Sequence, residues 1–155
     1  MGYITDFSGQ FNLDKPLDDE TYTLLKGLNE TRRMKRNVDP KYGVEGEFYV
    51  ESDAPSGQDF DNPNVIDGNT PPSTQPGLWC QWTPTEDRLH IEWDEGEKFY
   101  YYVEWIKYIV DKILKPRGYV LNGEVEWEGE STDDLGLLSI KDNVVTTKLG
   151  RIVYD

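Results

Sequence analysis

The most informative chemistry in the sequence is a run of carboxylates in its C-terminal half. Four glutamates alternate with other residues, and two aspartates follow them: Glu124, Glu126, Glu128, Glu130, Asp133 and Asp134. Alternate residues of a strand share one face, so the four glutamates, here called the acidic ladder, would stand about 6.6 Å apart. That spacing is similar to the spacing of phosphates along one nucleic-acid strand. No basic residue lies between Arg117 and Lys141, so the pattern predicts a binding site for a basic partner. The same alternation is also typical of the solvated outer face of an amphipathic strand.

Side chains that commonly perform catalysis are scarce. Cys80 and His90 are the single cysteine and the single histidine of the chain, and a predicted hairpin would bring their strands together as a thiolate and imidazole pair. Their spacing is not diagnostic, and a buried Cys80 beside an exposed His90 is the more ordinary interpretation. A glycosidase needs two carboxylates, but 30 acidic residues offer no specific pair. We therefore expect no catalytic residue and favour a protein that is not an enzyme.

The sequence predicts neither a cofactor nor a metal site. The glycines fall in no nucleotide-binding fingerprint. The acidic stretches at 59–62 and 67–69 lack the spaced ligands and the closing glutamate of a calcium loop.

Two further groups of residues are candidates for binding. A basic cluster in an otherwise acidic chain could hold a phosphate or an acidic partner, or it could decorate the C-terminus of a helix: Arg32, Arg33, Lys35 and Arg36. An aromatic set could line a surface or a pocket, although most large aromatic residues belong to a core: Trp79, Trp82, Trp93 and Tyr101.

Elements in the first half must position the basic cluster. Residues 1–16 are predicted to be an irregular arm that ends at Pro16. Asp18 caps a predicted helix that runs into the basic cluster, where cations suit the negative end of the helix dipole. Residues 44–51 are rich in strand formers and predict a strand. Residues 53–77 contain many Pro, Gly and Asp and predict a long loop, either a functional lid or a mobile segment.

Elements in the second half must position the acidic ladder. A hairpin is predicted from 78–83 and 88–93, and a capping box at 94–97 opens a core helix over about 95–115. Residues 119–130 alternate as a strand that carries the ladder, and 137–140 pair with 144–147 around Asp142 and Asn143. The fold class is therefore α+β, a mostly antiparallel sheet of roughly five to six strands with two helices.

Size and charge restrict the classes of function. A chain of 155 residues predicts a single domain over 1–155. The formal net charge of -14 argues against direct binding to nucleic acid or to an anionic membrane, and it favours a basic or nucleic-acid-handling protein as the partner. One cysteine, no signal-like start and no long apolar run predict a cytoplasmic location.

Three stretches, 31–36, 76–82 and 97–123, resemble a group of small acidic proteins of bacterial and phage genomes that has no settled function. The resemblance covers most of the chain, carries no catalytic residue and implies one cytoplasmic domain. A phage origin would, by analogy, favour an inhibitor of host defence such as the anti-restriction and anti-CRISPR proteins, some of which mimic nucleic acid.

Three functions remain open at the level of sequence. The first is an acidic interaction protein that covers a basic surface with the acidic ladder and the two aspartates that follow it. The second is a binder or hydrolase of small molecules or carbohydrates, with a pocket of aromatic and carboxylate side chains beneath the 53–77 loop. The third is a structural or regulatory subunit of an oligomer that packs through the face of Tyr100 to Tyr102.

Overall fold

The computed structural model describes residues 2–154, which form two compact units. One unit contains Met1–Leu17 and Gln81–Asp155, and we call it the sheet unit. The other contains Asp18–Cys80 and interrupts the first in sequence, so we call it the inserted unit. The single domain expected for 1–155 stays a prediction, because a division by contacts does not measure folding cooperativity.

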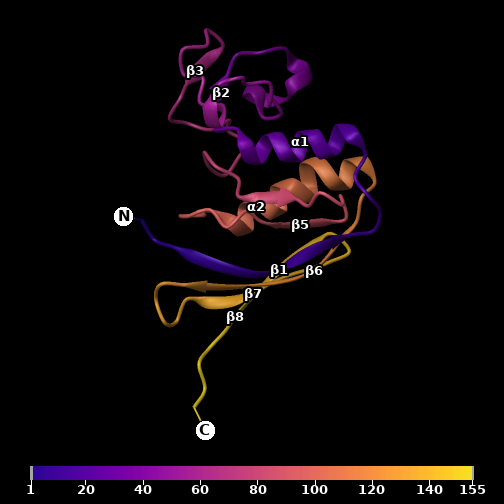
Figure 1. The fold of residues 1–155 in the computed structure, drawn as a ribbon, viewed down its shortest axis with the longest axis vertical. Helices are drawn as coiled ribbons and strands as arrows, with labels where there is room; N and C mark the ends of the chain where they lie inside the picture. The colour runs from indigo at the N-terminus through magenta and orange to yellow at the C-terminus, as the bar shows by residue number, and fades with distance from the viewer. Residues whose placement is uncertain (1, 155) are drawn as a thin grey trace. The chain divides into compact units, whose positions relative to one another are not determined.

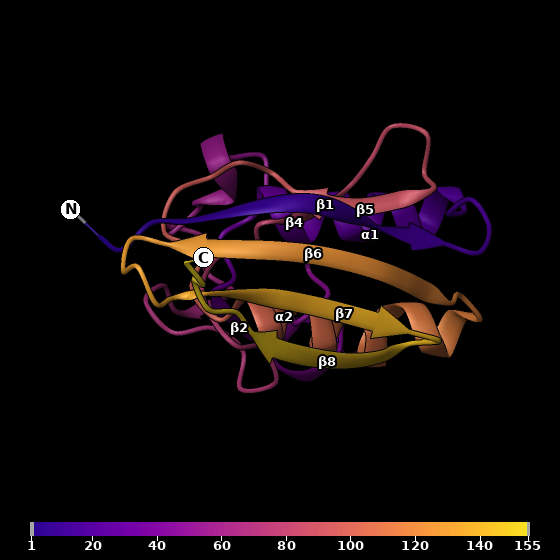
Figure 2. The ribbon, with the colours of Figure 1, turned by 90° about the horizontal axis from the view of Figure 1, so that it is seen from below.

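A six-stranded antiparallel sheet forms the sheet unit, in the order β4-β5-β1-β6-β7-β8. Its strands are β1 (Thr5–Leu13), β4 (Trp82–Pro84), β5 (His90–Trp93), β6 (Leu121–Gly129), β7 (Leu135–Lys141) and β8 (Val144–Leu149). Helix α2 (Tyr102–Tyr108) lies against one face of this sheet, and no described helix of the sheet unit lies on the opposite face (Figures 1 and 2). The α+β class and the antiparallel sheet are as the sequence predicts.

The N-terminal segment corrects the sequence prediction. Residues 1–16 are not an irregular arm, because β1 is a nine-residue strand between β5 and β6. It pairs with β6 over its whole length, from Thr5 opposite Gly129 to Leu13 opposite Leu121. Burial alternates along it, with Phe7 and Phe11 facing the core. The first residues of the chain therefore supply a central strand of the sheet.

The core of the sheet unit is built largely from aromatic rings. Phe7 is its centre, with ring centroids 5.4 Å from Trp82, 5.8 Å from Phe99 and 5.0 Å from Tyr102. These contacts are tilted or edge-to-face, the arrangement that the charge distribution of aromatic rings favours. Trp127 of β6 joins the cluster through Tyr102, at 5.8 Å.

The core helix begins later than its sequence predicts. Residues 94–101 are not helical, and Glu95, Lys98 and Tyr101 all have positive φ angles. Phe99 of this stretch is nevertheless buried, and its ring packs against those of Phe7 and Trp82. From Tyr102 the chain is helical through α2, a π-helical segment (Ile109–Leu114) and a 3-10 turn (Lys115–Arg117). Its buried face confirms the prediction of a core helix, and it includes Trp105, Ile106, Ile109, Val110, Ile113 and Leu114.

The C-terminal hairpin forms as its turn sequence predicts. Asp142 and Asn143 connect β7 to β8 with φ angles of 49° and 68°. Two consecutive positive φ angles match the right-handed twist of a two-residue hairpin, and Asp and Asn tolerate them better than most residues. β8 is an edge strand and most of its residues are exposed.

The inserted unit differs most from expectation. Helix α1 (Asp19–Glu30) begins as predicted, with the Asp18 carboxylate accepting a hydrogen bond from the Thr21 backbone N–H at 2.7 Å. It ends at Glu30, so the basic cluster follows the helix and does not form its last turn. Residues 44–51 form no strand; their only regular structure is a 3-10 turn (Val44–Gly46).

The predicted 53–77 loop has secondary structure of its own. A 3-10 turn (Pro55–Gly57) lies near its start, and β3 (Val65–Asp67) pairs with β2 (Lys35–Arg36). Arg36 donates to Asn64 at 2.8 Å and Arg32 donates to the main-chain oxygen of Gly68 at 2.9 Å. Arginines of the basic cluster therefore contact this segment through charge-assisted hydrogen bonds.

No helix within residues 2–154 combines the length and the apolar character that a membrane span requires.

Candidate interaction surface

Three of the four glutamates of the acidic ladder lie on β6, on the face of the sheet opposite α2, which we call the outer face. Val125 and Trp127 point into the core and are buried. Glu124, Glu126 and Glu128 alternate with them and are exposed. The period-two pattern of the sequence therefore places three of the four predicted glutamates in one column.

Strand β1 adds polar and acidic groups beside this column. Asp6 lies opposite Glu128, Ser8 opposite Glu126 and Gln10 opposite Glu124. Directly opposed side chains of an antiparallel pair stand about 5 Å apart, and like charges at that distance are destabilising. The outer face thus carries a fourth exposed carboxylate, Asp6, and no cation on β1 to offset the ladder.

The ladder glutamates make no ion pair with any residue between positions 2 and 154. Carboxylates elsewhere in that range do: Glu30 pairs with Lys26, Glu45 with Lys35, Asp59 with Arg36, and Asp87 with the imidazole of His90 when it is protonated. An exposed ion pair stabilises the fold by only about 0–1 kcal/mol. Folding can therefore leave an exposed carboxylate without an ion-pair partner at little cost in stability. The ladder carboxylates therefore have no cation within ion-pair distance among the described residues.

Glu130 and Asp133 do not continue the column. A Glu130 carboxylate oxygen accepts a hydrogen bond from the Ile4 backbone N–H at 3.1 Å, which ties the strand end to the start of β1. Asp133 is exposed in the turn between β6 and β7. Both residues lie beyond the end of β6, so their carboxylates do not follow the regular spacing of the Glu124, Glu126 and Glu128 carboxylates.

Asp134 is held inside a hydrogen-bonded cluster. Its two carboxylate oxygens accept hydrogen bonds from the Tyr3 hydroxyl at 2.6 Å and from the Trp127 indole N–H at 3.0 Å. Burial and the nearby charges of Asp134 and Glu104 raise the pKa of Tyr102 to about 12. Asp134 therefore connects the N-terminal segment to an indole of the core, and its role as a binding residue stays a prediction.

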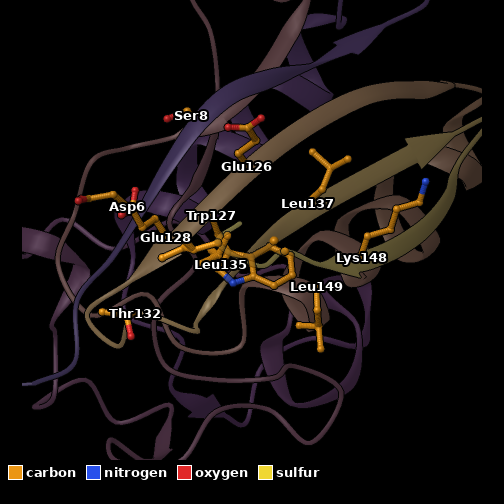
Figure 3. Close-up of a pocket in the computed structure, with 13 residues that line it drawn as sticks. Asp6, Ser8, Glu126, Trp127, Glu128, Thr132, Leu135, Leu137, Lys148 and Leu149 are labelled. Atoms are coloured by element: carbon orange, nitrogen blue, oxygen red, sulfur yellow. The ribbon is translucent and has the colours of Figure 1, made fainter. Parts of the chain in front are cut away.

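A groove of about 550 Å³ adjoins the ladder (Figure 3). Its walls are Asp6, Ser8, Glu126, Trp127, Glu128, Thr132, Leu135, Gly136, Leu137, Lys148, Leu149, Gly150 and Ile152. The carboxylates of Asp6, Glu126 and Glu128 stand on one side, and Lys148 stands at the other end. Leu135 and Leu137 of β7 lie between them. Sequence reasoning missed this apolar half of the surface.

The register of three neighbouring strands explains the change of chemistry across the groove. Glu126 of β6 lies opposite Leu137 of β7, and Leu137 lies opposite Lys148 of β8. Neighbouring strands are about 4.8 Å apart, so a carboxylate, an isobutyl group and an ammonium group follow one another in a short row. Lys148 is thus kept about two strand spacings from Glu126 by the intervening leucine.

Two arginines of the basic cluster are buried in the inserted unit. Arg33 and Arg36 are each 2% exposed. Arg36 pairs with Asp59 at 2.6 Å, and its guanidinium lies 4.4 Å from the centroid of the Tyr49 ring. Arg33 donates to the main-chain oxygen of Glu47 at 3.0 Å. These guanidinium groups hold the inserted unit together and are not presented to a phosphate or an acidic partner.

The other two members of the cluster also have internal partners. Arg32 donates to the main-chain oxygen of Gly68 at 2.9 Å, and the Lys35 ammonium pairs with Glu45 at 2.9 Å. Hydrogen bonds from Ser73, together with Lys35, lower the pKa of Glu45 to about 2. The basic cluster is therefore spread over several internal contacts.

The four aromatic candidates have different surroundings. Trp82 is buried in the core of the sheet unit, so it offers no platform to a ligand. Trp93 is half-buried and its indole N–H donates to the Gln81 side chain at 3.1 Å. Trp79 belongs to the inserted unit and is half-buried, whereas Tyr101 is 57% exposed.

A second cavity, of about 350 Å³, adjoins Trp93. Its other walls are Phe7, Gly9, Glu92, Asp94 and Glu95. This combines one indole with three carboxylates, but Trp79 and Trp82 are not among its walls.

Other candidate chemistry is also accounted for by local packing. Cys80 is buried and forms no disulfide with a described residue, and the His90 ring lies 3.3 Å from the Asp87 carboxylate. Within residues 2–154, no three His, Cys, Asp or Glu side chains are grouped so that they could hold a metal ion.

Comparison with known proteins adds no relative from which a role could be transferred to these residues. No protein-family model matches the chain, and neither a curated protein nor a solved structure is significantly similar to it.

Proposed function

We propose that this chain is an acidic interaction protein that covers a basic surface of a partner protein with the outer face of its sheet. The observation that carries the proposal is the column of Glu124, Glu126 and Glu128, joined by Asp6, with no ion pair to any of the described residues. Aligned like charges repel one another, so a cationic partner would relieve a cost that the free protein bears.

Charge of this sign also suggests the class of partner. Surfaces that bind nucleic acid are rich in Lys and Arg, because they neutralise phosphates. A nucleic-acid-handling enzyme, such as a host defence enzyme targeted by a phage inhibitor, belongs to this class. For such a partner the ladder carboxylates would take the place of phosphates.

The test compares two variants with the same change in charge. The ladder variant carries Glu124→Gln, Glu126→Gln and Glu128→Gln. The control variant neutralises three exposed carboxylates elsewhere in the sheet unit, through Glu86→Gln, Glu97→Gln and Asp111→Asn. Both variants lose three negative charges, so a general effect of net charge would appear in both.

Binding of a short oligolysine peptide should weaken about tenfold or more in the ladder variant and much less in the control, with both effects fading as salt rises. The same pattern should hold for basic proteins captured from a cell extract, and an oligonucleotide should displace a captured nucleic-acid-handling enzyme. Equal losses in the two variants would reject the outer face as the binding surface.

A further inference from the structure

The outer face is divided into two chemically different halves. β1 and β6 present carboxylates, whereas β7 presents Leu135 and Leu137 beside them. Lys148 of β8 stands beyond the leucines. Mimicry of a row of phosphates would need only the carboxylates and not the leucines. We therefore expect a partner that has both basic and apolar side chains on its binding surface.

We propose that the groove binds an amphipathic α-helix of the partner protein, laid along β6 and β7. Its apolar stripe packs on Leu135 and Leu137, and a row of Lys or Arg on one flank meets the carboxylates of β6. Acidic side chains on the opposite flank face Lys148. This inference rests on the proposed function, to which it adds the form and the pattern of the partner.

The backbone of the sheet decides between a helix and a strand. β6 is paired on both sides, with β1 and β7, and β7 is paired with β6 and β8. Their hydrogen-bonding groups are therefore used within the sheet, and the groove offers only side chains. An extended peptide covered by this face would leave its own N–H and C=O groups unsatisfied, whereas a helix satisfies them internally.

The dimensions also agree with a helix. A helix with its side chains is about 10–12 Å across, which covers two strands spaced about 4.8 Å apart. One helical turn advances about 5.4 Å and two strand residues advance about 6.8 Å. Long Lys and Arg side chains absorb that difference, so residues at i, i+4 and i+7 reach three successive carboxylates.

A second copy of this chain is a poorer occupant. The chain is strongly acidic, and α1 begins with acidic residues at Asp19 and Glu20. The apolar face of α2 is buried in the core, including Trp105 and Ile106. Neither helix therefore presents an exposed apolar stripe with a basic flank, so charge complementarity favours a different protein.

Three peptides of equal length test the proposal. The first is helical, with a Leu stripe, Lys on one flank and Glu on the other, so that its net charge is near zero. The second has the same composition rearranged to alternate with period two, as in a strand. The third is oligolysine, which reports on the proposed function alone. Affinities are measured by fluorescence anisotropy with the intact chain.

We expect the helical peptide to bind at least about tenfold more tightly than the period-two peptide. Leu137→Thr should weaken binding of the helical peptide about tenfold and leave oligolysine binding nearly unchanged, because it removes apolar contact without changing charge. Val144→Thr is the matched control: it makes a similar change on the exposed edge strand β8, outside the groove.

The other outcomes separate the two proposals. Equal binding of the first two peptides, or tighter binding of the period-two peptide, would overturn the helix while ladder-dependent oligolysine binding upheld the proposed function. If the ladder variant bound oligolysine as tightly as the control variant does, the proposed function itself would be rejected. Sedimentation of the chain as a dimer that Leu137→Thr dissociates would assign the groove to a second copy and overturn the proposal.

Discussion

Single residues of the acidic run have different roles although their sequence positions look alike. Glu126 is exposed on a paired strand and contacts no cation among the described residues, whereas Asp134, eight positions later, accepts two hydrogen bonds. Charge and period could therefore predict the ladder. Charge and period could not predict that Leu137 and Lys148 lie next to the ladder, because the sequence of one strand does not determine its register with another strand.

Asp134 provides a test at this scale. Asp134→Ala removes the acceptor of the Tyr3 hydroxyl and of the Trp127 indole N–H, so unfolding free energy should fall by about 1–3 kcal/mol. Asp133→Ala, at the exposed neighbouring position, should change it by less than about 0.5 kcal/mol. Urea denaturation measures both. If Asp134→Ala left stability unchanged but weakened oligolysine binding, Asp134 would be a binding residue after all.

Some elements could be predicted from their local sequence alone. Others could not, because their structure depends on contacts with residues far along the chain. The β7–β8 hairpin could be predicted because Asp142 and Asn143 suit its two positive φ angles. β1 could not be predicted so easily, since Gly9 interrupts its alternation and resembles a loop residue. In the structure Gly9 has a φ of +105°, and a Cβ there would lie 2.8 Å from the main-chain oxygen of Glu124. Close approach to β6 is thus the reason for this glycine.

β1 therefore carries a prediction for the core. Phe7 is 9% exposed and contacts four aromatic rings, so Phe7→Ala should reduce unfolding free energy by about 3–5 kcal/mol through the cavity it leaves. Ser8→Ala, the exposed neighbour on the same strand, should have little effect. Thermal or chemical denaturation of the two variants measures both unfolding free energies. Similar values for Phe7→Ala and Ser8→Ala would contradict the placement of Phe7 in the core and would favour the irregular arm that the sequence predicts.

At the scale of the whole molecule, the two units use charge differently. On the outer face of the sheet unit, Glu124, Glu126 and Glu128 form no ion pair with a described residue, whereas the inserted unit uses arginines and a lysine as internal partners of carboxylates and main-chain oxygens. The 53–77 stretch looked like a loop from its composition. Arg32 and Arg36 contact this stretch at Gly68, Asp59 and Asn64, and these partners could not be identified from sequence.

The inserted unit should consequently be sensitive to acid. The pKa of Glu45 is lowered from 4.5 to about 2, so its contribution to stability is present above pH 4.5 and disappears as pH falls toward 2. Glu45→Gln should flatten the pH dependence of the denaturation midpoint in that range. Asp53→Asn, an exposed position in the same unit, serves as the charge-matched control and should keep the slope of the original chain. Parallel curves for Glu45→Gln and the original chain would contradict the role of Lys35 and Ser73.

The insertion also has a consequence for biosynthesis. β1 emerges from the ribosome before the inserted unit, but its partners β5 and β6 follow that unit in the chain. While Asp18–Cys80 is synthesised, the apolar side chains of Phe7 and Phe11 therefore remain without the β5 and β6 strands that later cover them. A nascent chain at that stage exposes an unpaired hydrophobic strand, the kind of surface that is prone to aggregation until its partners are made.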